Sequence, residues 1–230
     1  MGLTIEVSGV AKHYGDLPVL RECSFTFEAN RTYALLGVNG AGKSTLLRLI
    51  ALLENPDQGD IRYVQSGHAL QPDLDLKRQI TLVLPQIGVF NTTVFKNVAY
   101  GLKIRGIPPK EVKGRVEGLL ELVGLLDKRD HQALTLSSGQ VRRLGLARAL
   151  VIEPQVLLLD EPTASLDPGN AAVIDAAIRE LRERRAATII MATHDYTQAG
   201  ELADRILVVE QGKIGEWSGS PFPGRSEAFA

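Results

Sequence analysis

The sequence contains almost no cysteine: only Cys23 carries a thiol among 230 residues. A single cysteine excludes an intrachain disulfide and a cluster of thiolate metal ligands within one chain. Cys23 alternates with Phe25 and Phe27, which is the spacing of side chains on one face of a strand. We therefore expect a thiol packed in the core rather than a reactive one.

Long apolar runs and an excess of one charge are absent as well. No apolar run approaches the roughly 18 residues that a membrane-spanning helix needs, and residues 1–6 do not have the character of a signal peptide. Lys and Arg number 26 against 27 Asp and Glu, so the formal net charge is −1 and no overall basic surface for nucleic acid is expected. These absences predict a cytoplasmic protein without a nucleic-acid partner, which reaches a membrane only through another protein.

The sequence does contain a glycine-rich stretch, residues 37–45, that fits the phosphate-binding pattern G-x-x-x-x-G-K-[ST]. The apolar run 33–36 before it predicts a buried strand, and residues 46–50 predict a helix, which is the context that the pattern requires. Glycines let the backbone wrap around phosphate oxygens, and the N–H groups and dipole of the helix attract the anion. The residues expected to bind nucleotide here are Gly37, Asn39, Gly40, Gly42, Lys43, Ser44 and Thr45.

Lys43 and Ser44 are the most specific part of this stretch. An ordinary glycine-rich turn before a helix would explain the glycines, but not a Lys-Ser pair at this offset. Lys43 would reach the β- and γ-phosphates, and the hydroxyl of Ser44 would be a ligand of Mg²⁺.

A second chemical element follows the apolar run 156–159, which ends in Asp160 and Glu161. A buried parallel strand delivers such residues to the carboxyl edge of the sheet, where ligands bind. Asp160 would hold Mg²⁺ through water, and Glu161 would polarise the attacking water. A chance pair of acids in a turn would not explain the four apolar residues that lead into them.

Short apolar runs that alternate with helical patterns predict the core of the fold. Continuous apolar runs, typical of strands buried on both faces, occupy residues 33–36, 80–84, 156–159, 188–192 and 206–209. With a helical pattern at 170–185, they favour a parallel sheet covered on both faces. Apolar and polar residues instead alternate in the N-terminal part, which predicts half-buried antiparallel strands at 4–8 and 20–27, with a further strand at 61–64.

Residues 87–150 differ from this pattern. Apolar residues recur at helical spacing in three segments, 92–104, 110–123 and 137–150, so we expect a helical insert between strands of the core. The polar residues 66–75 predict an exposed loop. Residues 218–230, rich in Ser, Gly and Pro, predict a loosely ordered tail.

Taken in order, these motifs resemble those of the ATP-binding subunit of an ABC transporter. The sequence L-S-S-G-Q at 136–140 is similar to the family signature L-S-G-G-Q, and residues 164–167 resemble its D-loop. Gln86 matches the glutamine loop, His194 matches the switch histidine, and Tyr14 stands where the family places an aromatic residue on adenine. The resemblance covers at least residues 14–194, and several motifs in the same order are far more specific than any one of them.

The resemblance implies an α/β fold, that of a P-loop NTPase. A mostly parallel core sheet would be joined to an N-terminal antiparallel β part and a helical insert. It also implies one ABC ATPase domain over residues 1–217, with a RecA-like core at 1–86 and 151–217, a helical subdomain at about 87–150, and a flexible tail at 218–230.

The family roles carry over residue by residue, with ATP and Mg²⁺ as cofactors. The catalytic residues would be Glu161, His194 and Gln86, and the Mg²⁺ site would involve Ser44, Gln86 and Asp160. Tyr14 would offer its ring to the base. In the family, the signature binds the γ-phosphate held by the opposite subunit, which implies a head-to-tail homodimer around two ATP molecules. The residues that contribute in this way would be Ser137, Ser138, Gly139, Gln140 and Asp167.

The implied function is ATP hydrolysis that powers a separate membrane permease, which would dock near residues 86–93. Residues 89–102 look like the matching stretch in tungstate, molybdate and phosphate importers, so a small oxyanion such as tungstate is the expected solute, with amino acids or other small solutes as alternatives. A substrate-binding protein would be an indirect partner. The chain would then lie in the cytoplasm, at the inner face of the cell membrane.

The sequence argues against two other functions. A non-transport ABC-type ATPase that acts on DNA would need a long coiled-coil insertion, and the ribosome-binding members carry two such domains; the sequence has neither feature. A regulatory module that binds ATP without turnover is disfavoured by Glu161, because a degenerate site usually loses its base.

The signature departs from the family at Ser138, where glycine is usual. The added hydroxyl could contribute a hydrogen bond or crowd the phosphate, and either effect is small. We expect Ser138→Gly to leave steady-state ATPase activity within about tenfold, a change of ~1.4 kcal/mol or less in activation free energy. A much larger change in either direction would contradict this prediction.

Overall fold

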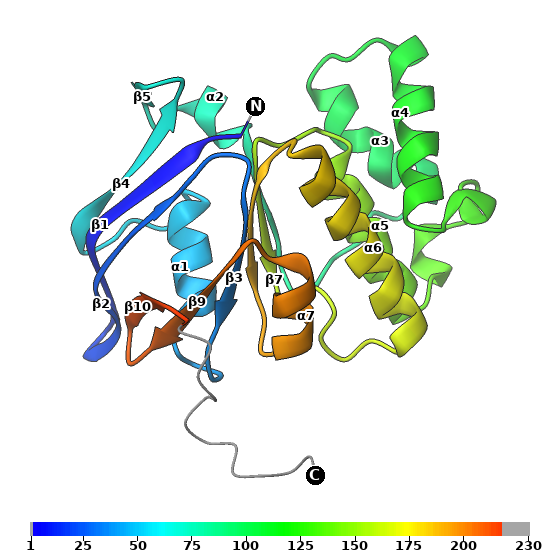
Figure 1. The fold of residues 1–230 in the computed structure, drawn as a ribbon. Helices are drawn as coiled ribbons and strands as arrows, with labels where there is room; N and C mark the ends of the chain where they lie inside the picture. The colour runs from blue at the N-terminus through cyan, green and yellow to red at the C-terminus, as the bar shows by residue number, and fades with distance from the viewer. Residues whose placement is uncertain (1, 218–230) are drawn as a thin grey trace, which may run out of the picture.

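The computed structural model describes residues 2–217, and the expected tail at 218–230 lies outside the described residues. Two sheets form its framework (Figure 1). The first has the order β2-β1-β4-β5, and all its pairs are antiparallel. Its strands are β1 (Thr4–Tyr14), β2 (Leu17–Phe27), β4 (Gln58–Gln65) and β5 (His68–Leu70). This sheet confirms the expected N-terminal antiparallel part.

The second sheet has the order β10-β9-β3-β8-β7-β6. Every pair in it is parallel except that of β10 with β9, which confirms the mostly parallel core. Its strands are β3 (Thr32–Leu36), β6 (Ile80–Val83), β7 (Val156–Asp160), β8 (Thr188–Ala192), β9 (Arg205–Glu210) and β10 (Lys213–Glu216). All five residues of β3, of β7 and of β8 are buried, as continuous apolar runs in a parallel sheet require.

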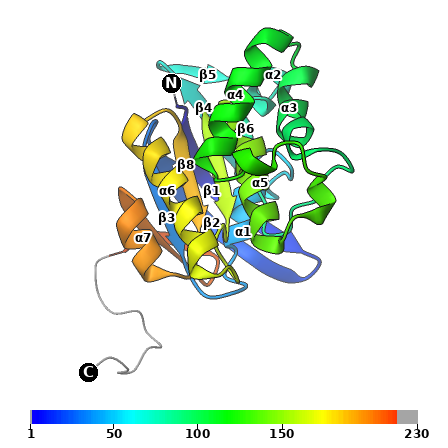
Figure 2. The same cartoon turned by 90° about the vertical axis from the view of Figure 1, so that its right-hand side faces the viewer.

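Helices cover both faces of the core sheet. The helices of residues 2–217 are α1 (Lys43–Ile50), α2 (Leu74–Lys77), α3 (Val94–Ile104), α4 (Pro109–Leu122), α5 (Ser138–Leu150), α6 (Pro168–Arg184) and α7 (Tyr196–Leu202). Two short 3₁₀ turns, η1 (Leu126–Lys128) and η2 (Ala133–Thr135), precede α5. One core cluster places α1 between the two sheets, and another packs α6 and α7 on the opposite face of the core sheet. Helices α3 and α4 lie on the β6 side, away from β10 (Figures 1 and 2).

Helix α5 belongs to two hydrophobic clusters at once. Leu146, Ala149 and Leu150 pack in the cluster of the core sheet, while Leu144 and Ala147 pack with α3 and α4. A helix that buries apolar residues around its circumference lies inside a structure rather than on its surface. The helical region is therefore joined to the core through the C-terminal half of α5.

The expected exposed loop at 66–75 is wrong in part. Gly67, with φ of 82°, allows a tight turn after β4, and the chain returns as β5. The side chain of Asp73 then accepts a hydrogen bond from the N–H of Leu76 and caps α2, whose Leu76 is buried. Both elements are too short for periodicity to show them. Helix α7 and strand β10 were not among the expected elements either.

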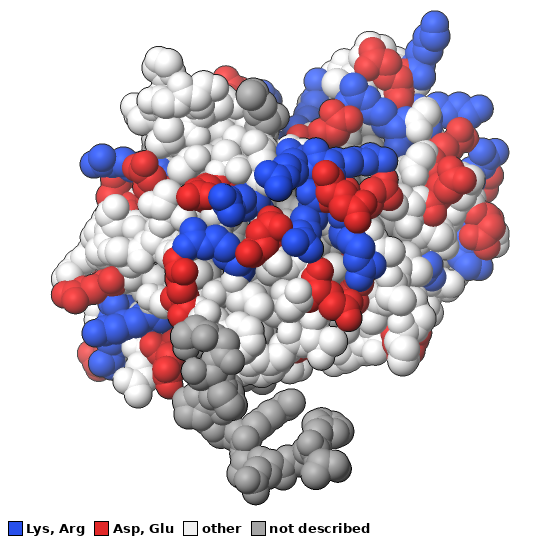
Figure 3. All heavy atoms as spheres, in the orientation of Figure 1, with Lys and Arg blue, Asp and Glu red and all other residues white. Residues whose placement is uncertain are grey.

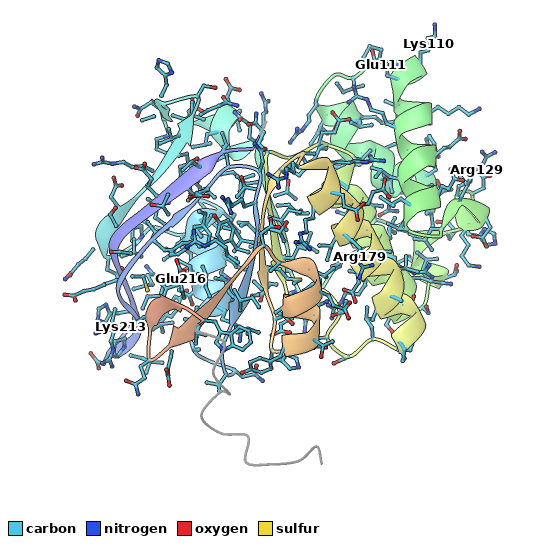
Figure 4. All side chains as sticks on the ribbon, viewed as in Figure 1. Lys110, Glu111, Arg129, Arg179, Lys213 and Glu216 are labelled. Atoms are coloured by element: carbon cyan, nitrogen blue, oxygen red, sulfur yellow. The ribbon has the colours of Figure 1, made fainter. Side chains whose placement is uncertain are left out.

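The surface carries both signs of charge. On the face in Figure 3, basic and acidic side chains are interleaved. Arg179 and Arg182 of α6, for example, pair with Glu201 and Asp204, and Figure 4 shows Arg179 on the side of α6 toward α7. Lys110 and Glu111 point outward at the start of α4 in the same view. Among the helices of residues 2–217, none has the length and apolar character that crossing a membrane requires.

A buried threonine ties the N-terminal segment to the core sheet. Thr188 is fully buried, and its hydroxyl donates to the carbonyl of Leu3 at 2.7 Å and accepts from the N–H of Asn30 at 3.0 Å. The substitution Thr188→Val keeps the shape of the side chain but leaves the carbonyl of Leu3 and the N–H of Asn30 without the hydroxyl. We expect it to lower the free energy of unfolding, measured in urea titrations, by about 1–3 kcal/mol.

The matched control is Thr197→Val, because Thr197 is an exposed threonine on α7. This change should cost no more than about 0.5 kcal/mol. Equal losses for the two variants would show that the hydroxyl of Thr188 does not stabilise the fold.

Candidate nucleotide-binding site

The glycine-rich loop connects β3 to α1 and contains three glycines with positive φ. The angles are 156° at Gly37, 83° at Gly40 and 105° at Gly42, and Gly42 is the N-cap residue of α1. Residues with a Cβ rarely adopt such angles. The loop can therefore turn its N–H groups inward at the start of a helix, which is the arrangement that binds anions.

Two of these glycines are also required by close packing. A Cβ on Gly37 would lie 2.4 Å from the carbonyl oxygen of Val209 on β9. A Cβ on Gly42 would lie 2.7 Å from Cδ2 of Leu20 and 3.0 Å from the carbonyl oxygen of Val19, both on β2. The loop is thus held between the two sheets, and its shape depends on strands far away in sequence.

The side chain of Lys43, the first residue of α1, is buried against the glycine-rich loop that precedes it. Its Nζ donates to the carbonyl of Gly37 at 2.6 Å and to that of Val38 at 3.2 Å. Burial lowers the pKa of the Lys43 ammonium, and the nearby carboxylates of Glu161 and Asp160 act in the opposite direction. A buried cation whose hydrogen bonds, within the described part of the chain, go to carbonyl oxygens is well placed to attract a polyanion.

Asp160 and Ser44 meet at the carboxyl end of β7. Asp160 is buried, and its Oδ1 accepts a hydrogen bond of 3.0 Å from Oγ of Ser44. Carboxylate and hydroxyl oxygens are hard donors that suit Mg²⁺. Within residues 2–217 no group of three or more His, Cys, Asp or Glu residues could hold a metal ion. The site therefore fits an ion that takes one or two protein ligands and completes its shell with phosphate oxygens and water.

Glu161 has an unusual backbone and a carboxylate with one free oxygen. Its φ is 49°, in the left-handed region, and its N–H donates to the carbonyl of Ala192 at 2.9 Å. Oε2 lies 2.8 Å from Nδ1 of His194, whereas Oε1 is buried and has no hydrogen-bond partner among residues 2–217. A buried acceptor without a partner indicates a ligand or water at that position. The structure thus places Glu161 and His194 in direct contact, and the catalytic roles of both residues stay predictions.

These groups border a cavity of about 320 Å³. Its lining consists of Leu17, Val19, Asn39, Gly40, Ala41, Gly42, Lys43, Ser44, Thr45, Asp160 and Glu161. Leu17 and Val19 were missed by sequence reasoning, because a strand approaches the loop only in the folded chain. Leu17 is 65% exposed at the edge of the cavity, which would suit a flat apolar ligand group.

Tyr14 and Gln86 lie outside this cavity. Tyr14, at the end of β1, is 44% exposed and its Oη donates to Glu54 at 2.5 Å. Gln86 follows β6 and lines another cavity, of about 290 Å³, formed with residues of α3 and α5. Neither Tyr14 nor Gln86 lines the cavity of the phosphate loop, and their roles stay predictions.

The signature residues 137–140 also lie outside it, at the N-terminus of α5. Oγ of Ser137 accepts from the N–H of Gln140 at 3.3 Å, and Oε1 of Gln140 accepts from the N–H of Ser137 at 3.0 Å. This capping box fixes the first turn, and Ser138 is exposed on it. Gly139 is buried, and a Cβ there would lie 2.4 Å from the side chain of Asn170.

Asp167 is the N-cap residue of α6. Its Oδ1 accepts from the N–H of Asn170 at 3.0 Å and its Oδ2 from the side-chain amide of Asn170 at 2.5 Å. These hydrogen bonds lower the pKa of Asp167. Asp167 thus stands beside the signature helix rather than beside the phosphate loop.

Comparisons with known proteins identify a family whose members are similar to this chain. Residues 20–164 match the family described as "ABC transporter". The chain is 39% identical to the tungstate uptake system ATP-binding protein TupC of Peptoclostridium acidaminophilum over 217 residues, which is 94% of this chain and 99% of that protein. It is 43% identical to the sulfate/thiosulfate import ATP-binding protein CysA of Synechococcus elongatus over 94% of this chain, but spans only 62% of the length of that relative.

A solved structure shows the same fold. CbiO1 of Clostridium perfringens, described as part of the ABC transporter complex cbiONQ, superposes with a TM-score of 0.79 at 30% sequence identity. The match covers 91% of this chain and 86% of that one.

The close packing of Gly37 against β9 predicts that one added methyl group at this position destabilises the fold. We expect Gly37→Ala to lower the free energy of unfolding by about 1–3 kcal/mol beyond the strain of the backbone angle, because the methyl group must displace the main chain of β9. The control is Gly40→Ala, where φ is also positive but a Cβ would meet no atom within 4 Å. Chemical unfolding of both variants distinguishes packing from backbone strain, and equal losses would contradict the assigned contact.

Proposed function

The chain belongs to the ABC transporter family, as an ATP-binding and ATP-hydrolysing subunit of importer-type systems, and from this membership we propose how it works. Two copies close head to tail around two ATP molecules, and their closure drives a separate membrane permease. The core at 1–86 and 151–217 binds the nucleotide, and the helical region at about 87–150 carries the signature and contacts the permease.

The chemistry rests on the groups around the phosphate loop. Lys43 would exchange the carbonyls of Gly37 and Val38 for oxygens of the β- and γ-phosphates. Ser44 and Asp160 would hold Mg²⁺, whose charge offsets that of the phosphates. Glu161 would accept the proton of the attacking water, and His194, bonded to Oε2 of Glu161, would help to orient that water. The free Oε1 of Glu161 is the acceptor available for this task.

One observation supports the two-chain site above all others. The residues that line the cavity of the phosphate loop include none of the signature at 136–140. Ser137 and Ser138 are nevertheless exposed at the N-terminus of α5, where N–H groups can bind an anion. In the proposed dimer, the signature and Asp167 of one copy complete the cavity of the other. ATP then drives closure because it binds the closed pair more tightly than the open one.

The permease would dock at the cavity that contains Gln86. This cavity lies between β6, α3 and α5, and Phe90 and Tyr100 stand beside it with ring centroids 4.8 Å apart. Both rings are substantially exposed, at 40% and 49%, which suits an apolar partner segment. The transported solute would be an oxyanion, since the named relatives serve tungstate and sulfate or thiosulfate. A substrate-binding protein would deliver it, and the permease would hold this chain at the inner face of the membrane.

We expect Glu161→Gln to lower steady-state ATPase activity by about 100-fold or more, because the amide cannot accept the proton of the attacking water. In the same variant, saturating ATP should convert the monomer into a stable dimer, since binding is kept and hydrolysis no longer ends it. Phosphate release and size-exclusion chromatography with and without ATP measure the two effects.

Lys43→Ala is the control, because it removes the cation that holds the phosphates and should prevent both hydrolysis and the dimer. A wild-type chain that turns over no faster than Glu161→Gln, alone and with its permease, would contradict the proposal. A Glu161→Gln chain that stays monomeric at saturating ATP, with and without the permease, would contradict the two-chain site.

A further inference from the structure

Arg142 connects the signature helix to the turn that carries Glu161. It lies on α5, and its guanidinium reaches the segment that follows β7. Nη1 donates to the carbonyl of Glu161 at 2.9 Å and to that of Pro162 at 3.5 Å, and Nη2 donates to the carbonyl of Ala164 at 3.4 Å. One side chain thus binds three carbonyls of a single turn.

The turn needs this support because its backbone is strained. Glu161 and Ser165 both have positive φ, at 49° and 62°. Such conformations are disfavoured for residues with a Cβ and persist only when neighbouring structure holds them. The main chain of Glu161 is held on one side by β8, through its N–H to Ala192, and on the other by Arg142, through its carbonyl. These two contacts fix the backbone of Glu161, from which the carboxylate extends to Nδ1 of His194.

The guanidinium is well suited to this task. Arg142 is half-buried, and burial lowers its pKa, while the negative charge of Glu161 acts in the opposite direction. An arginine stays charged in proteins, and its planar fork presents several donors in fixed directions. Hydrogen bonds from a charged donor are stronger than those between neutral groups. The fork of Arg142 therefore presents two separate nitrogens to the three carbonyls.

A second contact fixes the first turn of the same helix. Gly139, three residues before Arg142, packs directly against the side chain of Asn170, which in turn is bonded to Asp167. Helix α5 rises ~1.5 Å per residue, so the signature and Arg142 lie within about two turns of each other. The N-terminal half of α5 and residues 161–170 are therefore joined at two points.

We propose that Arg142 is a positioning residue that couples the two ATP sites of the dimer. When the signature of one chain binds the nucleotide of its partner, α5 is held in place, and Arg142 then fixes Glu161 of its own chain in the orientation for hydrolysis. Each site would thus become competent when the opposite nucleotide is bound. This inference rests on the proposed two-chain function.

Arg143 provides a matched control on the same helix. Its Nη1 donates to the carbonyls of Val123 and Gly124, at 2.9 and 3.1 Å, both in the helical region and away from Glu161. Arg142→Met and Arg143→Met each remove a guanidinium that binds backbone carbonyls of another segment. Only the first removes contacts with the catalytic turn.

For Arg142→Met we expect kcat of ATP hydrolysis to fall by about 10- to 100-fold, because Glu161 is misplaced, while KM for ATP changes by no more than about twofold. Arg143→Met should lower the thermal midpoint to a similar extent and leave kcat within about twofold of the wild type. Combined with Glu161→Gln, Arg142→Met should still form the ATP-dependent dimer. Should Arg142→Met not fold, Arg142→Lys keeps the charge and the aliphatic stem but not the fork, and it should show the same selective loss of kcat.

Equal losses of kcat in the Arg142 and Arg143 variants, or a change in KM alone, would overturn the inference. So would loss of the ATP-dependent dimer in the folded double variant, since Arg142 would then act on closure rather than on Glu161. If the wild type is inactive and Glu161→Gln stays monomeric, the proposed function itself fails. If the wild type hydrolyses ATP and Arg142→Met does so equally fast, only the role of Arg142 is refuted.

Discussion

The register of three parallel strands is the constraint on which the site depends. Ala192, the last residue of β8, pairs with Leu35 of β3 on one side and with Asp160 of β7 on the other. The phosphate loop and the two carboxylates therefore emerge at the same level of one sheet edge, although more than a hundred residues separate them in the sequence. The hydrogen bond from Ser44 to Asp160 spans the width of β8 and closes this arrangement. A shift of one residue in the pairing of β8 with β3 or with β7 would separate the ammonium of Lys43 from the carboxylates of Asp160 and Glu161.

Sequence reasoning can locate a candidate site where adjacent residues of one short motif determine the local geometry. The glycines, Lys43 and Ser44 are adjacent in the chain, and the apolar run before Asp160 shows directly that a buried strand leads to it. It failed where geometry comes from distant segments. The contacts of Leu17 and Val19 with the loop, and those of Arg142 with the turn at 161–164, arise only when separate elements pack together. No periodicity in the sequence marks them.

Periodicity and packing place the border of the helical region differently. Periodicity distinguishes helices from strands, and so it suggests a division near residue 150. The packing of side chains does not divide the chain there, because α5 buries one side against the core and the other against α3 and α4. A relative movement of the two regions would have to leave α5 attached to one of them. The bonds of Arg142 favour the core at the N-terminal half of this helix.

The position of the signature outside its own phosphate cavity has a consequence for affinity. In a two-chain site, the apparent dissociation constant for ATP depends on how often two copies meet, and therefore on protein concentration. A free chain in dilute solution would bind nucleotide through half of the contacts only. A membrane complex that anchors two copies side by side replaces that dilution by a high local concentration, which can exceed the bulk value by orders of magnitude. Assembly would thus set the nucleotide level at which the motor runs, without any change in the residues that touch ATP.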